Sequence, residues 1–155
     1  DPNSLSLLLV RGLSYEAKGD RPNARRAYER ALMINPRFAA AGNNLAALLA
    51  DSAPDRDSAL KVITAAKAAD PNNPAVTDTF GWVLYQRGEY DKAVEALKEA
   101  ATKLPNEPTV AYHLGMAYAK NGDAKAARRE LQRALSSQAA FPERDSAQKA
   151  LADLK

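Results

Sequence analysis

The sequence predicts an all-α protein in which one helix-turn-helix unit occurs four times in succession. Prolines that follow a helical apolar run recur at intervals of 34, 35 and 34 residues, at Pro2, Pro36, Pro71 and Pro105. Small residues that open a second apolar pattern recur at intervals of 35, 34 and 34, at Ala24, Ala59, Ala93 and Ala127. A third series has intervals of 34, 35 and 34, at Gly12, Ala46, Gly81 and Gly115. Agreement of three series on one period indicates a repeat architecture.

Each period contains two amphipathic helices, because its apolar residues recur at spacings of three and four. In the third unit we expect these helices near residues 80–84 and 90–101, with Gln86-Arg87-Gly88-Glu89 between them. Gly88 is expected to take the left-handed conformation that ends a helix, as are Gly19 and Gly122 in the first and fourth units. No stretch alternates with the period of two that a strand requires.

Glycine and alanine at fixed positions predict how the two helices of a unit pack. The glycines of the third series have no side chain, so the facing helix can approach closely, and the alanines of the second series act likewise from the other side. Large residues are expected to fill the space around these contacts: Tyr15, Tyr28, Leu84, Leu97, Tyr118 and Leu131. Replacing Gly115 by leucine should therefore overpack its helix pair.

Composition excludes several classes of protein. At 46% hydrophobic and 26% charged residues, the 155-residue chain has too much apolar content for a disordered tail. It lacks cysteine, which rules out disulfides, cysteine-based zinc sites and thiol catalysis. No apolar run approaches the ~20 residues of a membrane-spanning helix, so no membrane insertion is expected. A net charge of +3 demands no nucleic-acid partner.

The repeated unit resembles the tetratricopeptide repeat. The third unit shows the resemblance best, with Gly81-Trp82-Val83-Leu84-Tyr85, Gly88, Tyr90, Ala93, Leu97, Ala100 and Pro105. The second departs from it, because Ala46 replaces the glycine and Ile63 the aromatic residue, and the fourth has Ala139 where the proline would stand. The resemblance implies one domain, residues 1–155, folded as a right-handed superhelix, an α-solenoid. Its repeats would span about 5–38, 39–73, 74–107 and 108–141, followed by a capping helix at about 142–154.

The two ends of the chain differ in character. Asp1-Pro2-Asn3-Ser4 matches Asp70-Pro71-Asn72-Asn73, the tail of a unit, so we expect the chain to be a segment of a longer array. At the other end, Ala147, Ala150, Leu151 and Leu154 form one apolar side of a helix whose remaining face is polar. A helix of that kind is expected to cover the last repeat.

The resemblance also implies that the first helix of each unit lines a concave groove. The candidate binding residues read from those helices are Asn43, Asn44, Asp51, Asp78, Trp82, Tyr85, Gln86, Tyr112, His113, Met116 and Lys120. The asparagine amides can donate to and accept from an extended peptide backbone. The aromatic residues and Met116 offer apolar area with polar tips, as binding hot spots do.

Each candidate also has a structural interpretation. Trp82 is equally compatible with an anchor in the groove and with a filler between neighbouring first helices. Asn44 is favoured as a binder whose replacement by alanine would weaken binding and leave folding almost unchanged. His113 is favoured as a packing or solvated residue over a catalyst. Arginines and lysines on the second helices are interpreted as a solvated outer face with interleaved glutamates.

No catalytic, cofactor or metal site is expected, and the chain is predicted not to be an enzyme. The glycine pairs are not followed by the Lys-Ser/Thr of a phosphate loop, and one histidine cannot build an imidazole-rich metal site. The carboxylate clamp of heat-shock cochaperone repeats is also missing, because its basic positions hold Leu9, Ala40, Asn43, Ala75, Thr79, Thr109 and His113.

The functional hypothesis is an interaction scaffold that binds a protein or peptide partner in the groove. The run from Asn43-Asn44-Leu45 through residues 78–85 to Tyr112-His113-Leu114-Gly115 also resembles bacterial arrays of exopolysaccharide-export and exosortase (PEP-CTERM) loci. That resemblance favours a periplasmic or envelope-associated parent protein over a cytoplasmic one, although the compartment stays open. The alternative is a structural segment that self-associates or stacks on further repeats.

Overall fold

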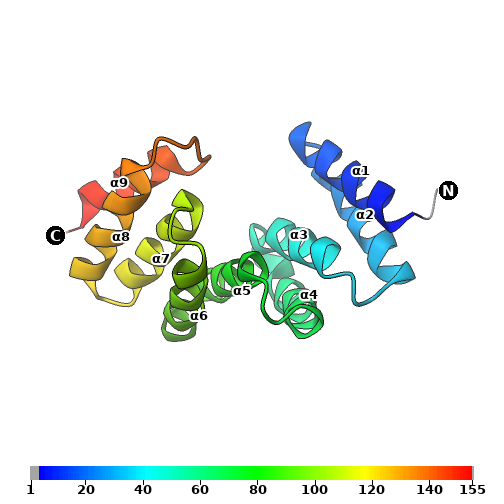
Figure 1. Ribbon diagram of the computed structural model, residues 1–155, viewed down its shortest axis with the longest axis horizontal. Coiled ribbons are helices and arrows are strands. Elements are labelled where there is room, and N and C mark those ends of the chain that lie inside the picture. Colours follow the sequence, from blue (N-terminus) through cyan, green and yellow to red (C-terminus); the bar gives the residue numbers. More distant parts are fainter. Residues whose placement is uncertain (1–3, 155) are drawn as a thin grey trace. The chain divides into compact units, whose positions relative to one another are not determined.

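The computed structural model describes residues 4–154, and these form helices without strands (Figure 1). The helices are α1 (Leu5–Ala17), α2 (Arg21–Ile34), α3 (Ala39–Ala50), the short 3-10 helix η1 (Ala53–Asp55), α4 (Arg56–Ala69), α5 (Pro74–Gln86), α6 (Tyr90–Lys103), α7 (Pro108–Lys120), α8 (Ala124–Ser136) and α9 (Arg144–Asp153). The predicted all-α fold class of helix-turn-helix repeats is confirmed. Pro2 and the match at residues 1–3 lie outside the described residues.

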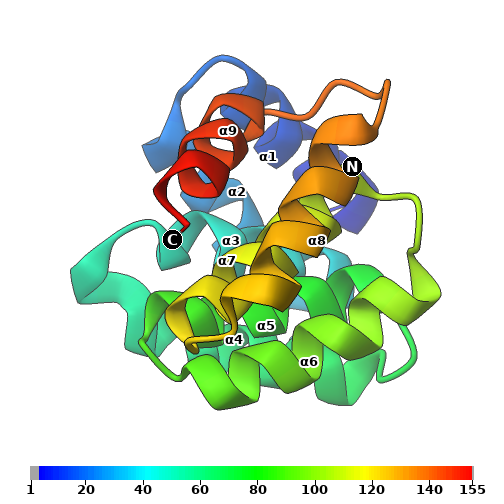
Figure 2. The ribbon, with the colours of Figure 1, turned by 90° about the vertical axis from the view of Figure 1, so that its left-hand side faces the viewer.

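The helices are grouped in two compact units, residues 1–79 and 80–155, and α5 spans the boundary between them. In the first unit, α1 packs on α2, α2 on α3, and α3 on α4. In the second unit, α6 packs on α7, α7 on α8, and α8 on α9 (Figures 1 and 2). Helix α2 thus contacts both α1 and α3, and α8 contacts both α7 and α9, which is how a repeat buries its apolar face.

Three glycines follow the first helices of the first, third and fourth repeats, and they have the predicted left-handed conformation. Gly19, Gly88 and Gly122 have φ angles of 73°, 82° and 87°. The next helix then begins with an aspartate cap in two of these turns, because Asp20 accepts from the backbone N–H of Asn23 at 3.2 Å and Asp123 from that of Ala126 at 2.9 Å. The hairpin turns are therefore set by local sequence.

The packing glycines lie directly against the large residues of the facing helix. A Cβ atom added to Gly81 would come within 2.6 Å of Leu97 Cγ, and one added to Gly115 within 2.8 Å of Leu131 Cγ. A Cβ on Gly12 would overlap the ring of Tyr28. The predicted close approach is present in all three hairpins, where a larger residue would force the helices apart.

Tyr15 and Tyr118 do not fill the core in the way their spacing predicted. Both are half-buried, and each lines a surface hollow beside arginine side chains of the second helix in its hairpin. Their hydroxyl groups can therefore form hydrogen bonds with water. A fully buried Tyr hydroxyl would instead need a hydrogen-bond partner within the protein. Tyr28, by contrast, is fully buried as expected.

Helix α9 covers the apolar side of the last hairpin. Phe141 and Ala147 are buried with Tyr112, Leu131 and Ala134 in one core cluster. Arg144, at the start of the helix, donates to the carbonyl oxygens of Leu135 at 3.1 Å and Ser137 at 2.6 Å, and its guanidinium lies 5.3 Å from the centre of the Phe141 ring. These contacts hold the polar-faced helix in place as a cap.

Candidate functional site

The predicted binding residues fall into two sets, one in each compact unit. In the first unit, Asn43 and Asn44 are neighbours on α3, and both are half-buried. Asn43 Nδ2 donates to Asn44 Oδ1 at 3.4 Å, while the Oδ1 atom of Asn43 is buried without a hydrogen-bond partner among the described residues. One amide oxygen in this pair is therefore available to a donor that could reach it.

Asn44 takes part in a hydrogen-bonded network that connects three helices. Its side chain bonds to the hydroxyl of Tyr28 on α2, and that hydroxyl donates to the carboxylate of Glu16 on α1. Burial, and then the bond to Glu16, raise the pKa of Tyr28 far above its usual value, whereas the bond from Asn44 opposes the rise. Asn44 thus contributes to packing in the first unit, a role that its sequence position did not indicate.

The acidic candidates of the first unit are in different surroundings. Asp51 forms an ion pair with Arg21, with 3.1 Å between Oδ2 and Nη2, and both side chains are about half exposed. Arg21 also donates to the carbonyl oxygen of Leu48 at 2.7 Å. Asp78 is buried, so its carboxylate is not presented to solvent.

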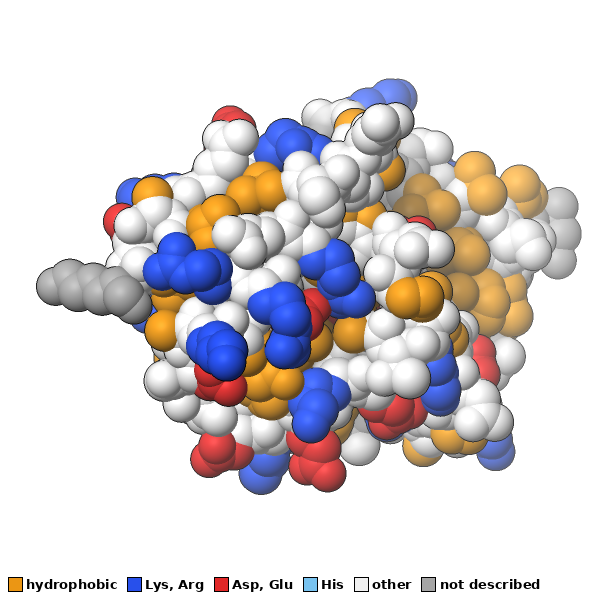
Figure 3. All heavy atoms as spheres, turned by 60° about the vertical axis from the view of Figure 1, so that its left-hand side comes forward, with side chains coloured by type: hydrophobic (Ala, Val, Ile, Leu, Met, Phe, Trp, Pro, Cys, Tyr) orange, Lys and Arg blue, Asp and Glu red, His pale blue; other side chains and the backbone are white. Residues whose placement is uncertain are grey.

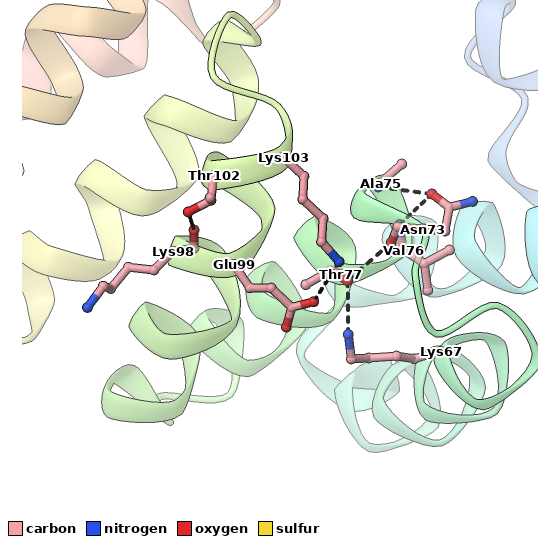
Figure 4. Close-up of polar contacts among 9 residues, drawn as sticks. All are labelled: Lys67, Asn73, Ala75, Val76, Thr77, Lys98, Glu99, Thr102 and Lys103. Carbon is pink, nitrogen blue, oxygen red and sulfur yellow. Dashed lines mark hydrogen bonds and ion pairs between the residues drawn. The ribbon is translucent and has the colours of Figure 1, made fainter.

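A polar network fixes the start of α5 in the first unit (Figure 4). Asn73 Oδ1 accepts from the backbone N–H of Ala75 at 3.0 Å and caps the helix. Thr77 is fully buried, accepts from Lys67 Nζ at 2.9 Å, and donates to the carbonyl oxygen of Asn73 at 3.1 Å. On α6, in the second unit, Lys103 Nζ donates to Glu99 Oε1 at 3.2 Å.

An aromatic stack brings together four of the candidates in the second unit. The Trp82 ring lies between Tyr85 and His113, with centroid distances of 4.6 and 4.1 Å and interplanar angles of 11° and 18°. Tyr112 is tilted against Trp82 at 5.9 Å. Because both faces of the indole are covered, a partner could reach only its edge.

Exposure separates the stack into a buried and an accessible part. Tyr112 and His113 expose only 6% and 8% of their surfaces, whereas Trp82 and Tyr85 are half-buried. Tyr90, at the start of α6, extends the cluster with its ring centre 5.6 Å from that of Tyr85. The sequence indicated Tyr90 only as a residue of the repeat pattern, and its position at the start of a helix gave no indication that it would approach the stack.

Two phenols of the stack, those of Tyr85 and Tyr112, have a raised pKa. Burial raises the pKa of Tyr85, and the neighbouring Tyr112 and Tyr90 add to the rise. Burial likewise raises the pKa of Tyr112, against the opposing effect of a hydrogen bond with Ser146 on α9. Tyr112 therefore ties α7 to the capping helix, while Tyr85 is left as the accessible neutral hydroxyl.

The remaining predicted binding residues of the second unit are a methionine, an amide and a cation. Met116 and Trp82 both pack, partly buried, against the core cluster around Tyr112. Gln86 is half-buried at the end of α5, and Lys120 is exposed at the end of α7. The first-helix face of the second unit thus offers the Trp82 edge, Tyr85 and Met116, flanked by an amide and a cation.

Two of the basic side chains on α8 are paired with a buried carboxylate of the same helix. On the face brought forward in Figure 3, Lys and Arg side chains stand among acidic and hydrophobic ones. Glu130, only 6% exposed, lies 3.0 Å from Arg129 Nε and 2.8 Å from Arg133 Nη2. This carboxylate partly neutralises the charge of the two arginines.

Within residues 4–154, no group of three or more His, Cys, Asp or Glu side chains could hold a metal ion. In the same part of the chain, none of the helices has the length and apolar character needed to cross a membrane.

Paired helices of fixed length, closed by glycine turns and packed through glycine contacts, define a helical-repeat protein. Three tetratricopeptide-repeat family models match the chain, over residues 6–38, 81–122 and 108–141. The chain therefore contains tetratricopeptide repeats.

Several known proteins are similar to this chain in sequence or in structure. The TPR repeat-containing protein PA4667 of Pseudomonas aeruginosa is 32% identical over 114 residues, which are 74% of this chain and 19% of that protein. This chain thus spans only about a fifth of the length of that relative. A solved structure described as the functional characterization of Pseudomonas aeruginosa pilF has a TM-score of 0.79 at 26% identity, covering 97% of this chain and 67% of that one. The APC/C hetero-tetramer Cut9-Hcn1 has a TM-score of 0.84 at 21% identity, over 97% of this chain and 29% of the other, which shows a shared fold.

Proposed function

We propose that this chain is a non-catalytic interaction scaffold that binds a peptide or partner segment on the first-helix face of its repeats. The observation that carries the proposal is the accessible edge of the aromatic stack in the second unit. Trp82 and Tyr85 are held in one arrangement by ring stacking, beside Met116. Rigid aromatic side chains lose little conformational entropy on binding, and they are frequent binding hot spots.

The first unit supports the same kind of binding through a different group. The buried Oδ1 atom of Asn43 has no hydrogen-bond partner among the described residues, and an incoming backbone N–H would satisfy it. Asp51, at the end of α3, lies in the same unit and is paired there with Arg21. A segment with a free backbone edge fits these groups of the first unit best.

A random peptide library displayed on phage tests the proposal without knowledge of the natural partner. Peptides selected on the wild-type protein should bind a Tyr85→Ala/Met116→Ala variant at least about tenfold more weakly, because the apolar anchor is removed. Lys125→Ala/Gln132→Ala on α8 is the matched control, since both side chains are exposed on a second helix. Equal loss in the control, with both variants folded by circular dichroism, would contradict the proposed surface.

The single tryptophan gives an independent measurement. Its half-buried position should produce the emission of a partly hydrated indole that changes when a selected peptide binds. Emission that no soluble quencher reaches and no peptide alters would show that Trp82 only packs.

We also propose that the partner belongs to a bacterial envelope assembly for polysaccharide export. Support comes from the resemblance of the Asn43–Leu45, 78–85 and 112–115 runs to arrays of such loci. Fractionation of cells that produce the parent protein tests this placement: recovery with the envelope is expected, and recovery in the cytosol alone would refute it.

A further inference from the structure

The junction between the first two repeats contains an apolar hollow of about 250 Å³. Phe38 and Gly42 line it at the start of α3, and Val62 and Ala65 line it from α4. Lys61 is the only charged residue in the lining, and all the lining residues belong to the first unit. Because an apolar cavity of about 150 Å³ can hold a benzene ring, this hollow has room for the side chain of a leucine or a phenylalanine.

The corresponding junction of the second unit is polar. It contains a hollow of about 220 Å³ between the α6–α7 connection and the end of α8, where Glu107 stands at the position of Phe38. Arg133 stands at the position of Ala65, and its Nη1 atom donates to the carbonyl oxygen of Pro105 at 3.3 Å. The repeat fold therefore does not require an apolar surface at this place, and the apolar hollow is a property of the first unit.

Phe38 occupies the N-cap position of α3 without capping the helix. Its side chain forms no hydrogen bond there, whereas Asn73, at the same position one repeat later, accepts from the backbone N–H of Ala75 at 3.0 Å. Polar N-cap residues stabilise the start of a helix, so a phenylalanine at this position stabilises α3 less. What Phe38 contributes instead is a half-buried apolar wall of the hollow.

Stacking of further repeats does not cover this hollow. Within the compact units a second helix packs on the first helix of the next repeat, as α2 does on α3 and α6 on α7, so a preceding repeat would pack on α1. No residue of α1 lines the hollow. In the second unit, α9 packs on α8 beyond the corresponding junction, and the hollow there stays open. A repeat of the same array is therefore not the expected occupant.

The charges beside the hollow are positive. Lys61 lines it, Arg37 precedes Phe38 in the α2–α3 connection, and both cations are exposed. No acidic side chain belongs to the lining. Apolar pockets with a few charged groups at the edge bind an apolar group whose flanking charges are opposite in sign.

We propose that this hollow binds a leucine or phenylalanine side chain presented by an acidic segment of a partner protein. The apolar side chain lies against Phe38, Val62 and Ala65, and carboxylates on either side of it pair with Lys61 and Arg37. This inference goes beyond the proposed function, since it uses neither the aromatic stack nor the asparagines.

Three synthetic peptides test the hollow by NMR titration of the ¹⁵N-labelled chain. The first has one phenylalanine between glutamates, the second has alanine in place of the phenylalanine, and the third has lysines in place of the glutamates. We expect the first peptide to shift the amide signals of Gly42, Val62 and Ala65. It should bind at least about tenfold more tightly than the other two, with affinity that falls as salt rises.

Two pairs of variants locate the binding. Ala65→Phe fills the hollow and should weaken binding by about tenfold or more, whereas Thr64→Phe adds the same ring at an exposed position of α4 outside the lining and should leave binding unchanged. Arg37→Glu/Lys61→Glu should also weaken binding by about tenfold. Its matched control is Lys125→Glu/Lys149→Glu, which changes the net charge equally at exposed positions of the second unit.

The proposal is overturned if the first peptide does not bind, if the alanine peptide binds as tightly, or if either control loses as much affinity as the variant it matches. Binding to this chain but not to the full-length parent protein would show that a segment of the parent fills the hollow, and would also overturn it. Ala65→Met repeats the test with a smaller side chain should the phenylalanine reduce stability.

Discussion

At the scale of single residues, Asn44 lies half-buried in α3 with its amide hydrogen-bonded to the phenol of Tyr28. Its sequence position indicated a binder, because an amide inside a helix adds little helix stability. The structure adds a reason for its presence that spacing could not reveal, since the partner Tyr28 is 16 residues away on another helix.

Asn44→Ala is therefore expected to destabilise the protein, in contrast to the sequence-based expectation of almost unchanged folding. The buried Tyr28 hydroxyl would lose a partner, at a cost of about 1–3 kcal/mol of unfolding free energy. Urea denaturation followed by circular dichroism measures the loss, with exposed Asn72→Ala as the control. Identical urea midpoints for the two variants would show that Asn44 does not contribute to stability, which would leave only a role in binding.

At the scale of elements, each hairpin depends on the contact between a glycine and the large residue that faces it. Periodicity and glycine spacing predicted the helix pairs, the left-handed turns at Gly19, Gly88 and Gly122, and the packing positions. These features are local or strictly repeated, so they are visible in sequence. The 3-10 helix η1, in the one turn with an extra residue, breaks the repeat and was not predicted.

Gly115→Leu should separate α7 from α8 and cost about 1–3 kcal/mol or more of stability. The added Cβ would lie 2.8 Å from Leu131 Cγ and 3.2 Å from the backbone nitrogen of Leu131, which cannot move without the helix. Thermal denaturation measures the effect. Gly42→Ala is a graded comparison, because its Cβ meets a single methyl group, on Ala66, at 3.0 Å. An unchanged melting temperature for Gly115→Leu would be incompatible with this packing.

At the scale of the whole molecule, the chain consists of two compact units built of nearest-neighbour helix contacts. The free energy of unfolding of such proteins is approximately a sum of terms for the repeats and for the interfaces between them. A substitution in one unit therefore need not destabilise the other unit equally. Trp82 lies in the second unit and reports on it, whereas circular dichroism reports on all helices.

Gly12→Leu should consequently affect the two signals unequally. The leucine side chain would overlap Tyr28 and destabilise the first unit. We therefore expect the midpoint of the circular dichroism transition to fall more than the midpoint measured by Trp82 emission. Gly115→Leu, placed in the second unit, should lower the Trp82 midpoint and serves as the reciprocal variant. Equal shifts of both signals in Gly12→Leu would show that the chain unfolds as one cooperative block.

The helices, their turns and the packing of small residues against large ones were predictable from the sequence, because they follow from periodicity and from residues whose conformations are restricted. It also indicated which helix faces carry asparagines and aromatic rings. The contacts of Trp82 with His113 and Tyr85, and the contact of Tyr112 with the capping helix, became visible only in the folded chain. These contacts join side chains that are distant in sequence. Their burial and hydrogen bonding depend on how the helices pack, so they cannot be read from any single segment.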